Sequence, residues 1–445
     1  MFFKLRLEII EKSLSISIWN KLFFLNELNI VNFSLESFLS VSTIKRKFKR
    51  LNSLLESYDF MITSKDNIYM LQGNETNIRY FSSSLFWNIY NGAKWPFYNI
   101  DQRKIIKLID ATTEDLSFPI SYSLNSRFSY SFAVGITRYF HNQTINLEQN
   151  DEWDKLKKIN NSLTNHLSTN IIKMLVEDYL LSEDEAHYEF SRLQIVKSFY
   201  KDQKTIVVAI ELHEKFETSI YKASVKFIEL LEKHAHINLS EDQKKKVMVS
   251  ALCGHYKSFF YHDIPILKQE IDGILINYYS LRSLVERIYS ELCESVGTCI
   301  FKQKNFLINQ YMYTISEILP LNYFEAEISI YFDESIDLPI EQLVKNMLNN
   351  FFKEPFNLRI YGPSDILHFN KNDIDLVLSS TYTEKIIDNY PNTPIMFLKS
   401  SILNLSEREI LQLKEILSII NRNNKDRSKI ICELKKMRNL LINET

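Results

Sequence analysis

Apolar residues recur with helical spacing over most of the first 320 residues of this 445-residue chain. The spacing predicts amphipathic helices over about 4–24, 35–39 and 41–58, with a tight turn before the third helix. Two short runs then alternate apolar and polar residues, at 60–63 and 68–71, and the polar residues between them predict a hairpin. This order of elements is that of a winged helix-turn-helix.

The pattern changes twice further along the chain. From about 101 to 322 it is nearly all helical, with a polar break at 201–205. After 324, apolar runs alternate with helical periodicity, which predicts a small parallel α/β unit. The expected elements are strands at 328–332, 358–361, 374–378 and 394–398, a helix at 338–352, and two amphipathic helices within 405–442.

We therefore predict a mainly α, multidomain fold of four parts. A winged helix-turn-helix occupies 1–100, helical domains occupy 101–205 and 206–322, and a small α/β domain with C-terminal helices occupies 323–445.

The composition disfavours several classes of protein. Only 7 of the residues are glycine, and neither G-x-G-x-x-G nor G-x-x-x-x-G-K-[ST] occurs, so a nucleotide-driven enzyme is disfavoured. The four cysteines form no C-x-x-C pair, which fits a reducing compartment, and charged residues interrupt every apolar run well before the roughly 18 residues of a membrane span. We expect a cytoplasmic protein that is not an enzyme, needs no cofactor or metal, and makes no membrane contact.

The charge is unevenly distributed. Residues 1–50 hold nine Lys and Arg and four Glu, or +5, so the net charge of −2 leaves −7 for residues 51–445. Five positive charges and no negative one lie between Glu36 and Glu56. A basic head on an acidic body indicates an anionic partner such as DNA, although a basic run taken alone is more often a solvated helix face.

The third predicted helix holds the candidate DNA-binding residues. Ser40 stands at the N-cap position, and Ile44, Phe48, Leu51 and Leu55 are spaced to share one buried stripe. In a recognition helix, residues near the N-terminus reach base edges while flanking Lys and Arg neutralise phosphates. The base-edge candidates are Ser42, Thr43, Arg46 and Lys47. The candidates for backbone contacts are Lys45, Lys49, Arg50 and, in the predicted wing, Lys65, which would reach a neighbouring phosphate or the minor groove.

The stretch after the hairpin is Leu71-Gln72-Gly73-Asn74-Glu75-Thr76-Asn77-Ile78-Arg79-Tyr80-Phe81, followed by Trp95-Pro96-Phe97. It resembles the G-x-E-x-x-I/V-R-x-F block, leading to W-P-F, that comes after the wing in virulence and transcription regulators of the Mga/AtxA type. We expect Gly73 to permit the turn out of the wing, Asn74 to cap the next helix, and Ile78, Phe81 and Leu85 to form an apolar face. The similarity is clear over about 8–100 and around 133–145.

The resemblance also implies a domain order for the rest of the chain. The family has two helical PTS-regulation domains and then a PTS enzyme IIB-like α/β domain, an order that segments 101–203, 206–322 and 324–400 fit. It implies a transcription regulator that binds double-stranded promoter DNA as a homodimer. Family members usually have a further helix-turn-helix ahead of this one, which we expect to be missing from this chain.

Phosphoryl regulation is where this sequence departs from the family. The positions aligned with its phosphorylatable histidines hold Ser126, Ser131 and Arg192 in the first domain and Met312 in the second. The loop after the first α/β strand, 333–337, has no cysteine, although phosphoryl transfer needs a His or Cys there. We expect degenerate regulation without labelling by phosphotransfer-system proteins, with His255 as the remaining candidate regulatory histidine.

Three other functions stay open. The chain could be a DNA-incompetent partner subunit, an RNA-binding PTS-regulated antiterminator, or an enzyme of the sugar-phosphotransfer system. The antiterminator is disfavoured because 1–58 does not predict a β-rich domain, and the enzyme because the reactive Cys and His are missing.

Two side-chain clusters receive a structural interpretation. The first cluster is not expected to bind a metal, because its spacing does not match a metal motif. Its members are His234, His236, Cys253, His255 and His262. The second, Asp184-Glu185-Ala186-His187, is expected to be a solvated helix start.

Overall fold

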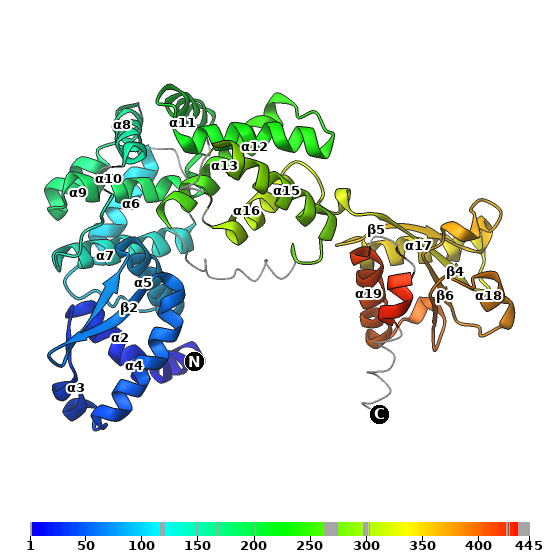
Figure 1. Cartoon of the computed structure of the whole chain (residues 1–445), viewed down its shortest axis with the longest axis horizontal. Coiled ribbons are helices and arrows are strands. Elements are labelled where there is room, and N and C mark those ends of the chain that lie inside the picture. Colours follow the sequence, from blue (N-terminus) through cyan, green and yellow to red (C-terminus); the bar gives the residue numbers. More distant parts are fainter. Residues whose placement is uncertain are drawn as a thin grey trace. The chain divides into compact units, whose positions relative to one another are not determined.

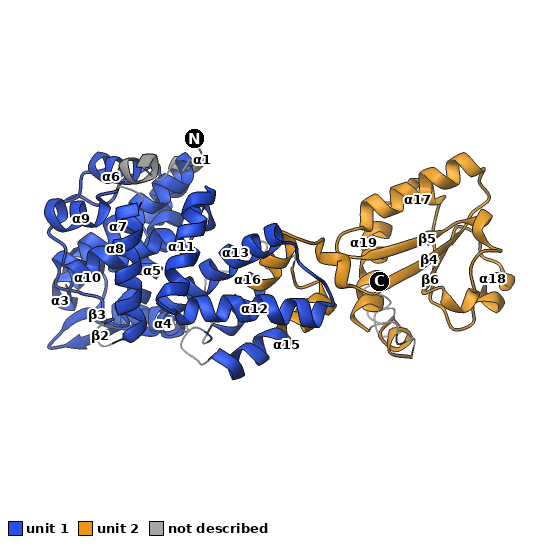
Figure 2. Ribbon diagram, turned by 90° about the horizontal axis from the view of Figure 1, so that it is seen from above, with its two compact units in different colours: residues 1–267, 288–310 blue, residues 268–287, 311–445 orange. Residues whose placement is uncertain are grey.

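The computed structural model divides the chain into two units, Met1–Leu267 with Ile288–Gln310, and Lys268–Arg287 with Tyr311–Thr445 (Figure 2). Helices dominate it, with one three-stranded antiparallel sheet near the N-terminus and one four-stranded parallel sheet in the second unit. The mainly helical, multidomain fold with a small α/β part is thus confirmed, while the four-domain boundaries stay a prediction. The residues described are 2–115, 121–147, 150–166, 169–200, 202–261, 275–296, 301, 303–423, 426 and 428–434.

The N-terminal elements have the order of a winged helix-turn-helix (Figure 1). The predicted helix over 4–24 is wrong in one respect, because Ser13 caps a second helix with its side chain and splits the segment in two. The strand at Leu28–Asn29 was not predicted, because two residues are too few to produce an alternating pattern. The elements are α1 (Phe2–Glu11), α2 (Leu14–Phe24), β1 (Leu28–Asn29), α3 (Ile30–Ser37), α4 (Val41–Leu55), the 3-10 turn η1 (Glu56–Tyr58), β2 (Phe60–Lys65) and β3 (Ile68–Gly73).

The wing is a hairpin of β2 and β3, with β1 pairing on the other side of β3. Asp66 and Asn67 have φ of 53° and 67°, so two residues with left-handed backbone close the turn, as tight hairpins require. Lys65 therefore ends a strand rather than lying in the polar connection that the sequence suggested.

Gly73 ends the wing with φ of 146°, which confirms the turn expected there. A Cβ at this position would lie 2.5 Å from the Cα of Phe60. The side chain of Asn74 then caps α5 (Glu75–Tyr90) by accepting from the amides of Thr76 and Asn77, also as expected.

Helix α5 belongs to both the winged helix and the helices after it. The Phe81 ring lies 4.9 Å from those of Trp19 and Tyr58, which fixes α5 against α2 and η1. The later helices are α6 (Gln102–Asp115), α7 (Tyr122–Phe140), α8 (Asp151–His166), α9 (Ile171–Tyr179), α10 (Glu183–Gln194), α11 (Gln203–Lys215), α12 (Ser219–Ala235), α13 (Glu241–Phe260), α15 (Tyr279–Val296) and α16 (Lys304–Ser316).

The second unit contains the predicted parallel sheet, in the order β5-β4-β6-β7. Alternate residues of β4 face opposite sides: Ile330 packs among residues of α17 and α19, whereas Tyr331 packs against Ile386 and Tyr390, in and just after α18. Each predicted strand and the helix at 338–352 are confirmed within a few residues. The elements are β4 (Glu327–Asp333), α17 (Leu338–Phe352), β5 (Asn357–Tyr361), β6 (Leu376–Ser379), α18 (Glu384–Asn389), β7 (Ile395–Phe397) and α19 (Glu407–Arg422).

Among the residues that the structure describes, no helix is both long and apolar enough to cross a membrane.

Replacing Gly73 with Ala should lower the free energy of unfolding by about 3 kcal/mol or more, because the backbone conformation is nearly restricted to glycine and the new Cβ would overlap Phe60. Chemical denaturation of the full chain measures this. Gly92→Ala is the matched control: it also has positive φ, 77°, but its Cβ would meet only a ring atom of Trp87, at 3.9 Å. An equal or larger loss in the control would contradict this account of the wing.

Candidate nucleic-acid interface

The start of α4 is fixed by Ser40. Its hydroxyl accepts from the Thr43 amide at 3.2 Å, which confirms the expected cap, and lies 2.8 Å from the Ser42 hydroxyl and 2.9 Å from the Thr43 hydroxyl. The hydroxyl groups at this end of the helix are therefore held in a local network.

One stripe of α4 packs inward. Ile44, Phe48 and Leu55 are buried, as predicted, and Leu51 is half-buried. The 100° step of a helix places Ser42, Arg46, Lys49 and Arg50 on the opposite side, where all four are exposed.

The remaining candidates lie at the flanks of this face. Lys45 is exposed on the side of α4 that also carries Asn52, seven residues later. Thr43 and Lys47 are half-buried on the other flank. The seven candidates of α4 therefore share one helix, but they do not share one face.

Within the described part of the chain, no carboxylate lies within 4 Å of any of the five basic side chains of α4. The acidic residue of α3, Glu36, is paired with Lys21 at 2.5 Å. Among the described residues, the basic side chains of α4 are therefore not neutralised by ion pairs, which leaves them able to neutralise phosphates.

The wing is packed firmly on α4. The Phe48 and Tyr69 rings stack at 4.3 Å, and the side-chain amide of Asn52 bonds both the N–H and the carbonyl of Ile62, at 2.8 and 2.9 Å. Lys65 lies exposed beside the turn at the wing tip. Sequence reasoning missed Asn52 and Tyr69, although both hold the wing against the helix.

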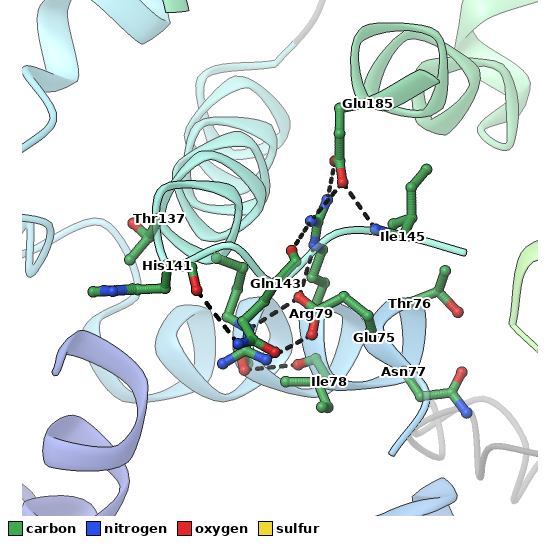
Figure 3. A network of polar contacts seen from close by, with 12 residues as sticks. Glu75, Thr76, Asn77, Ile78, Arg79, Thr137, His141, Gln143, Ile145 and Glu185 are labelled. Carbon is green, nitrogen blue, oxygen red and sulfur yellow. Dashed lines mark hydrogen bonds and ion pairs between the residues drawn. The ribbon is translucent and has the colours of Figure 1, made fainter. Parts of the chain in front are cut away.

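A buried charge cluster joins α5 to α7 and α10, and sequence reasoning missed it. Arg79 of α5 lies between Glu75, at 3.0 Å, and Glu185 of α10, at 2.6 Å (Figure 3). Arg138 of α7 bonds the same Glu75 at 2.6 Å. The i,i+4 spacing of Glu75 and Arg79 was a signal that could have indicated the pair.

This cluster corrects the interpretation of 184–187 as a solvated helix start. Glu185 is 1% exposed and His187 is 5% exposed. Ser182 caps α10, so the segment does begin a helix, but nearly all of that helix is buried. Burial of Glu185 requires a partner such as Arg79, because an unpaired buried carboxylate would be strongly destabilising.

Burial alone would lower the pKa of Arg79, but the carboxylates of Glu185 and Glu75 raise it above its ordinary value. Burial raises the pKa of Glu189, while Arg192 and Arg79 act in the opposite direction.

Ser131 and Arg192, which were expected from the family resemblance to align with regulatory histidines, are in contact in the structure. Nη1 of Arg192 is 3.3 Å from the carbonyl of Ser131 and 2.9 Å from Oε2 of Glu189. Ser126 is half-buried in α7, and Met312 is fully buried in α16. The site formed by Ser131 and Arg192 therefore holds the permanently charged guanidinium of Arg192.

His255, the candidate regulatory histidine, is fully buried in α13. Its Nδ1 lies 2.9 Å from the hydroxyl of Ser224. Burial lowers the pKa of His255 to about 3, so its ring is neutral at pH 7.

No group of three or more His, Cys, Asp or Glu in the described ranges could hold a metal ion. His234 instead lies 2.6 Å from Glu291, and Cys253 is buried. His262 lies outside the described residues.

Glu334 lies in the loop after β4, where the sequence has no cysteine. The Glu334 carboxylate accepts from the Ser380 hydroxyl at 3.0 Å and from the Ile402 amide at 3.3 Å. It thus joins the ends of β4 and β6.

Comparison with known proteins bears on the N-terminal domain. Residues 4–86 match the Mga helix-turn-helix domain. The chain is similar to a "Putative trans-acting regulator" of Streptococcus pneumoniae, with 24% identity over 103 residues, which are 23% of this chain and 21% of that protein. The aligned stretch thus spans about a fifth of the relative's length. The resemblance to Mga-type regulators is confirmed, and a regulator is favoured over an enzyme.

The chain is also similar to an "Adenylate kinase isoenzyme 6 homolog" of Plasmodium falciparum, with 22% identity over 173 residues, 38% of this chain and 86% of that protein. The sequence contains no G-x-x-x-x-G-K-[ST] loop to cradle a nucleotide phosphate.

Proposed function

We propose that this protein, a regulator with an Mga helix-turn-helix domain, acts in the cytoplasm without enzymatic activity and binds double-stranded promoter DNA through α4 and the wing. The observation that carries the proposal is the set of five basic side chains on α4 that have no acidic partner in the described structure. They lie on the helix after the turn of a winged helix-turn-helix, the position of a recognition helix.

The proposed contacts divide along α4. Ser42 and Arg46, exposed in its N-terminal half, would reach base edges in the major groove, where Arg pairs with guanine. Lys45, Lys49 and Arg50 would contact phosphates. Thr43 and Lys47 are half-buried at a flank and would support the helix position more than read bases. Lys65 would contact a neighbouring phosphate or the minor groove.

Arg46→Ala combined with Lys49→Ala should weaken binding to AT-rich promoter duplex by about 1–3 kcal/mol for the lost base contact. The slope of log affinity against log salt should fall by about 0.9 for the lost phosphate contact. Folding should be unaffected, because both side chains are exposed. A salt-controlled gel-shift titration measures both effects.

The matched control is Lys104→Ala with Lys107→Ala, which removes the same charge from exposed positions of α6. Equal loss of affinity in both double variants would mean that binding depends on overall charge and would contradict the assignment to α4. Preference for RNA over duplex DNA would favour the antiterminator instead, and no binding to either would favour a DNA-incompetent subunit.

We further propose a homodimer, and the second unit supports it. Ile340, Leu343 and Phe351 lie on the outer side of α17 and are 38%, 60% and 56% exposed. The charged residues of α17, Glu341 and Lys345, pair with each other at 2.7 Å away from that side. An uncharged apolar stripe suits pairing with a second copy, which brings no like charge against it.

Leu343→Glu with Phe351→Glu should therefore convert the dimer into a monomer at micromolar concentration, because the exposed stripe would carry repelling charges. Light scattering measures the mass. Leu411→Glu, on α19 and 67% exposed, is the control and should stay dimeric. Dissociation of the control alone, or a monomeric wild-type protein, would overturn the proposal.

Phosphoryl regulation is proposed to be degenerate. His255 is buried, and Ser126, Ser131, Arg192 and Met312 cannot form phosphohistidine. Incubation with phosphoenolpyruvate and the general phosphotransfer proteins should leave the chain unlabelled, while the histidine carrier protein in the same reaction is labelled. Acid-labile phosphate on this chain that disappears in His255→Ala would restore regulation of the ordinary kind.

A further inference from the structure

Helix α5 makes two sets of buried contacts with different parts of the first unit. Toward the winged helix, Phe81 packs on Trp19, and the amide of Asn77 donates to the carbonyl of Tyr58 at 3.1 Å. Toward the later helices, Glu75 and Arg79 enter the charge cluster (Figure 3). Helix α5 therefore links the winged helix to the helical segment.

The cluster contains equal numbers of positive and negative groups from three helices. Arg79 donates to Glu185 at 2.6 Å, and its Nη1 is 3.7 Å from Glu189, which bonds Arg192 at 2.9 Å. The Glu75 side chain is 10% exposed, and the other five residues are buried. The six residues are Glu75 and Arg79 of α5, Arg138 of α7, and Glu185, Glu189 and Arg192 of α10.

The backbone around the cluster is fitted to it. The carbonyl of Gln143 accepts from Arg79 at 2.8 Å, and the amide of Ile145 donates to Glu185 at 2.9 Å. On α7, a Cβ at Gly135 would lie 2.1 Å from Oε1 of Glu189, so the helix leaves space for that carboxylate. A buried charge is tolerated only while its partner stays in place, and a rotation or shift of α5 would separate several pairs at once.

We propose that this cluster is a positioning device, which holds the winged helix in one orientation on the helical segment and thereby supports binding to DNA by both heads of the dimer. None of its members belongs to the DNA-facing surface of α4. The inference rests on the proposed DNA binding and the proposed homodimer, but the orientation itself can be measured without DNA. Arg192 is charged at every physiological pH, so the positive charge of its ion pair with Glu189 is kept under all these conditions.

The first experiment measures orientation directly. Spin labels are placed at the exposed positions Lys65→Cys, on the wing, and Lys158→Cys, on α8, in a full chain whose native cysteines are replaced by Ala or Ser. Wild type should give one narrow distance distribution. Glu185→Gln removes one charge and should broaden it. Asp184→Asn is the control, because the neighbouring Asp184 bonds Trp153 and Lys157 outside the cluster.

Should Glu185→Gln fail to fold, as judged by circular dichroism, Arg79→Met with Glu185→Met removes both partners without leaving a buried charge. This variant should fold and also give a broad distribution. A narrow distribution at the wild-type distance in a folded cluster variant would overturn the proposal, whether or not the protein binds DNA.

The second experiment links orientation to binding. On an AT-rich duplex of about 40 bp, roughly four helical turns, folded Glu185→Gln should lose about tenfold or more in affinity, because the two heads no longer bind together. On a duplex of about 12 bp, roughly one turn, it should bind like wild type and Asp184→Asn. Equal losses on both duplexes would show that the head itself is damaged and would contradict a positioning role.

Discussion

The burial of Arg79 is the constraint on which the arrangement of the first unit depends. A guanidinium with no exposed surface is stable only with carboxylates held against it, and Glu75 and Glu185 meet this need from two helices. Because Arg138 binds the same Glu75, α5, α7 and α10 are joined at one point. The winged helix packs on α5 as well, so the cluster and the proposed DNA-binding head share one supporting helix.

The same arrangement explains how the chain can carry a basic head on an acidic body. Two acidic residues of this part of the chain are used internally: Glu36 neutralises Lys21, and Glu75 is bound by two arginines. Arg46 and its basic neighbours on α4 are therefore left available to an outside anion. The wing contributes by bracing the helix through Phe48 and Tyr69 rather than by covering it. The basic surface of α4 is thus a consequence of how the acidic side chains are packed as well as of the composition of the chain.

Local elements could be predicted from the sequence because their causes are local. The Ser40 cap, the buried stripe of α4, the wing and the strands of the second unit each result from spacing within a few residues. The charge cluster could not be predicted, since Arg79 and Glu185 are 106 positions apart and no periodic pattern links them. For the same reason 184–187 looked like a solvated helix start. The candidate DNA-contacting residues were predicted as a group, but which of them share a face of α4 could be seen only from the packing of that helix.

Hydrogen–deuterium exchange of the full chain, with and without an AT-rich duplex at fixed salt, tests the central claim most directly. Binding through α4 and the wing predicts slower exchange concentrated at 40–50 and 64–68, with the strands of the second unit unchanged. Protection confined to other segments, with none at 40–50, would show that DNA binds elsewhere. No change anywhere at a concentration that saturates binding would equally contradict the account.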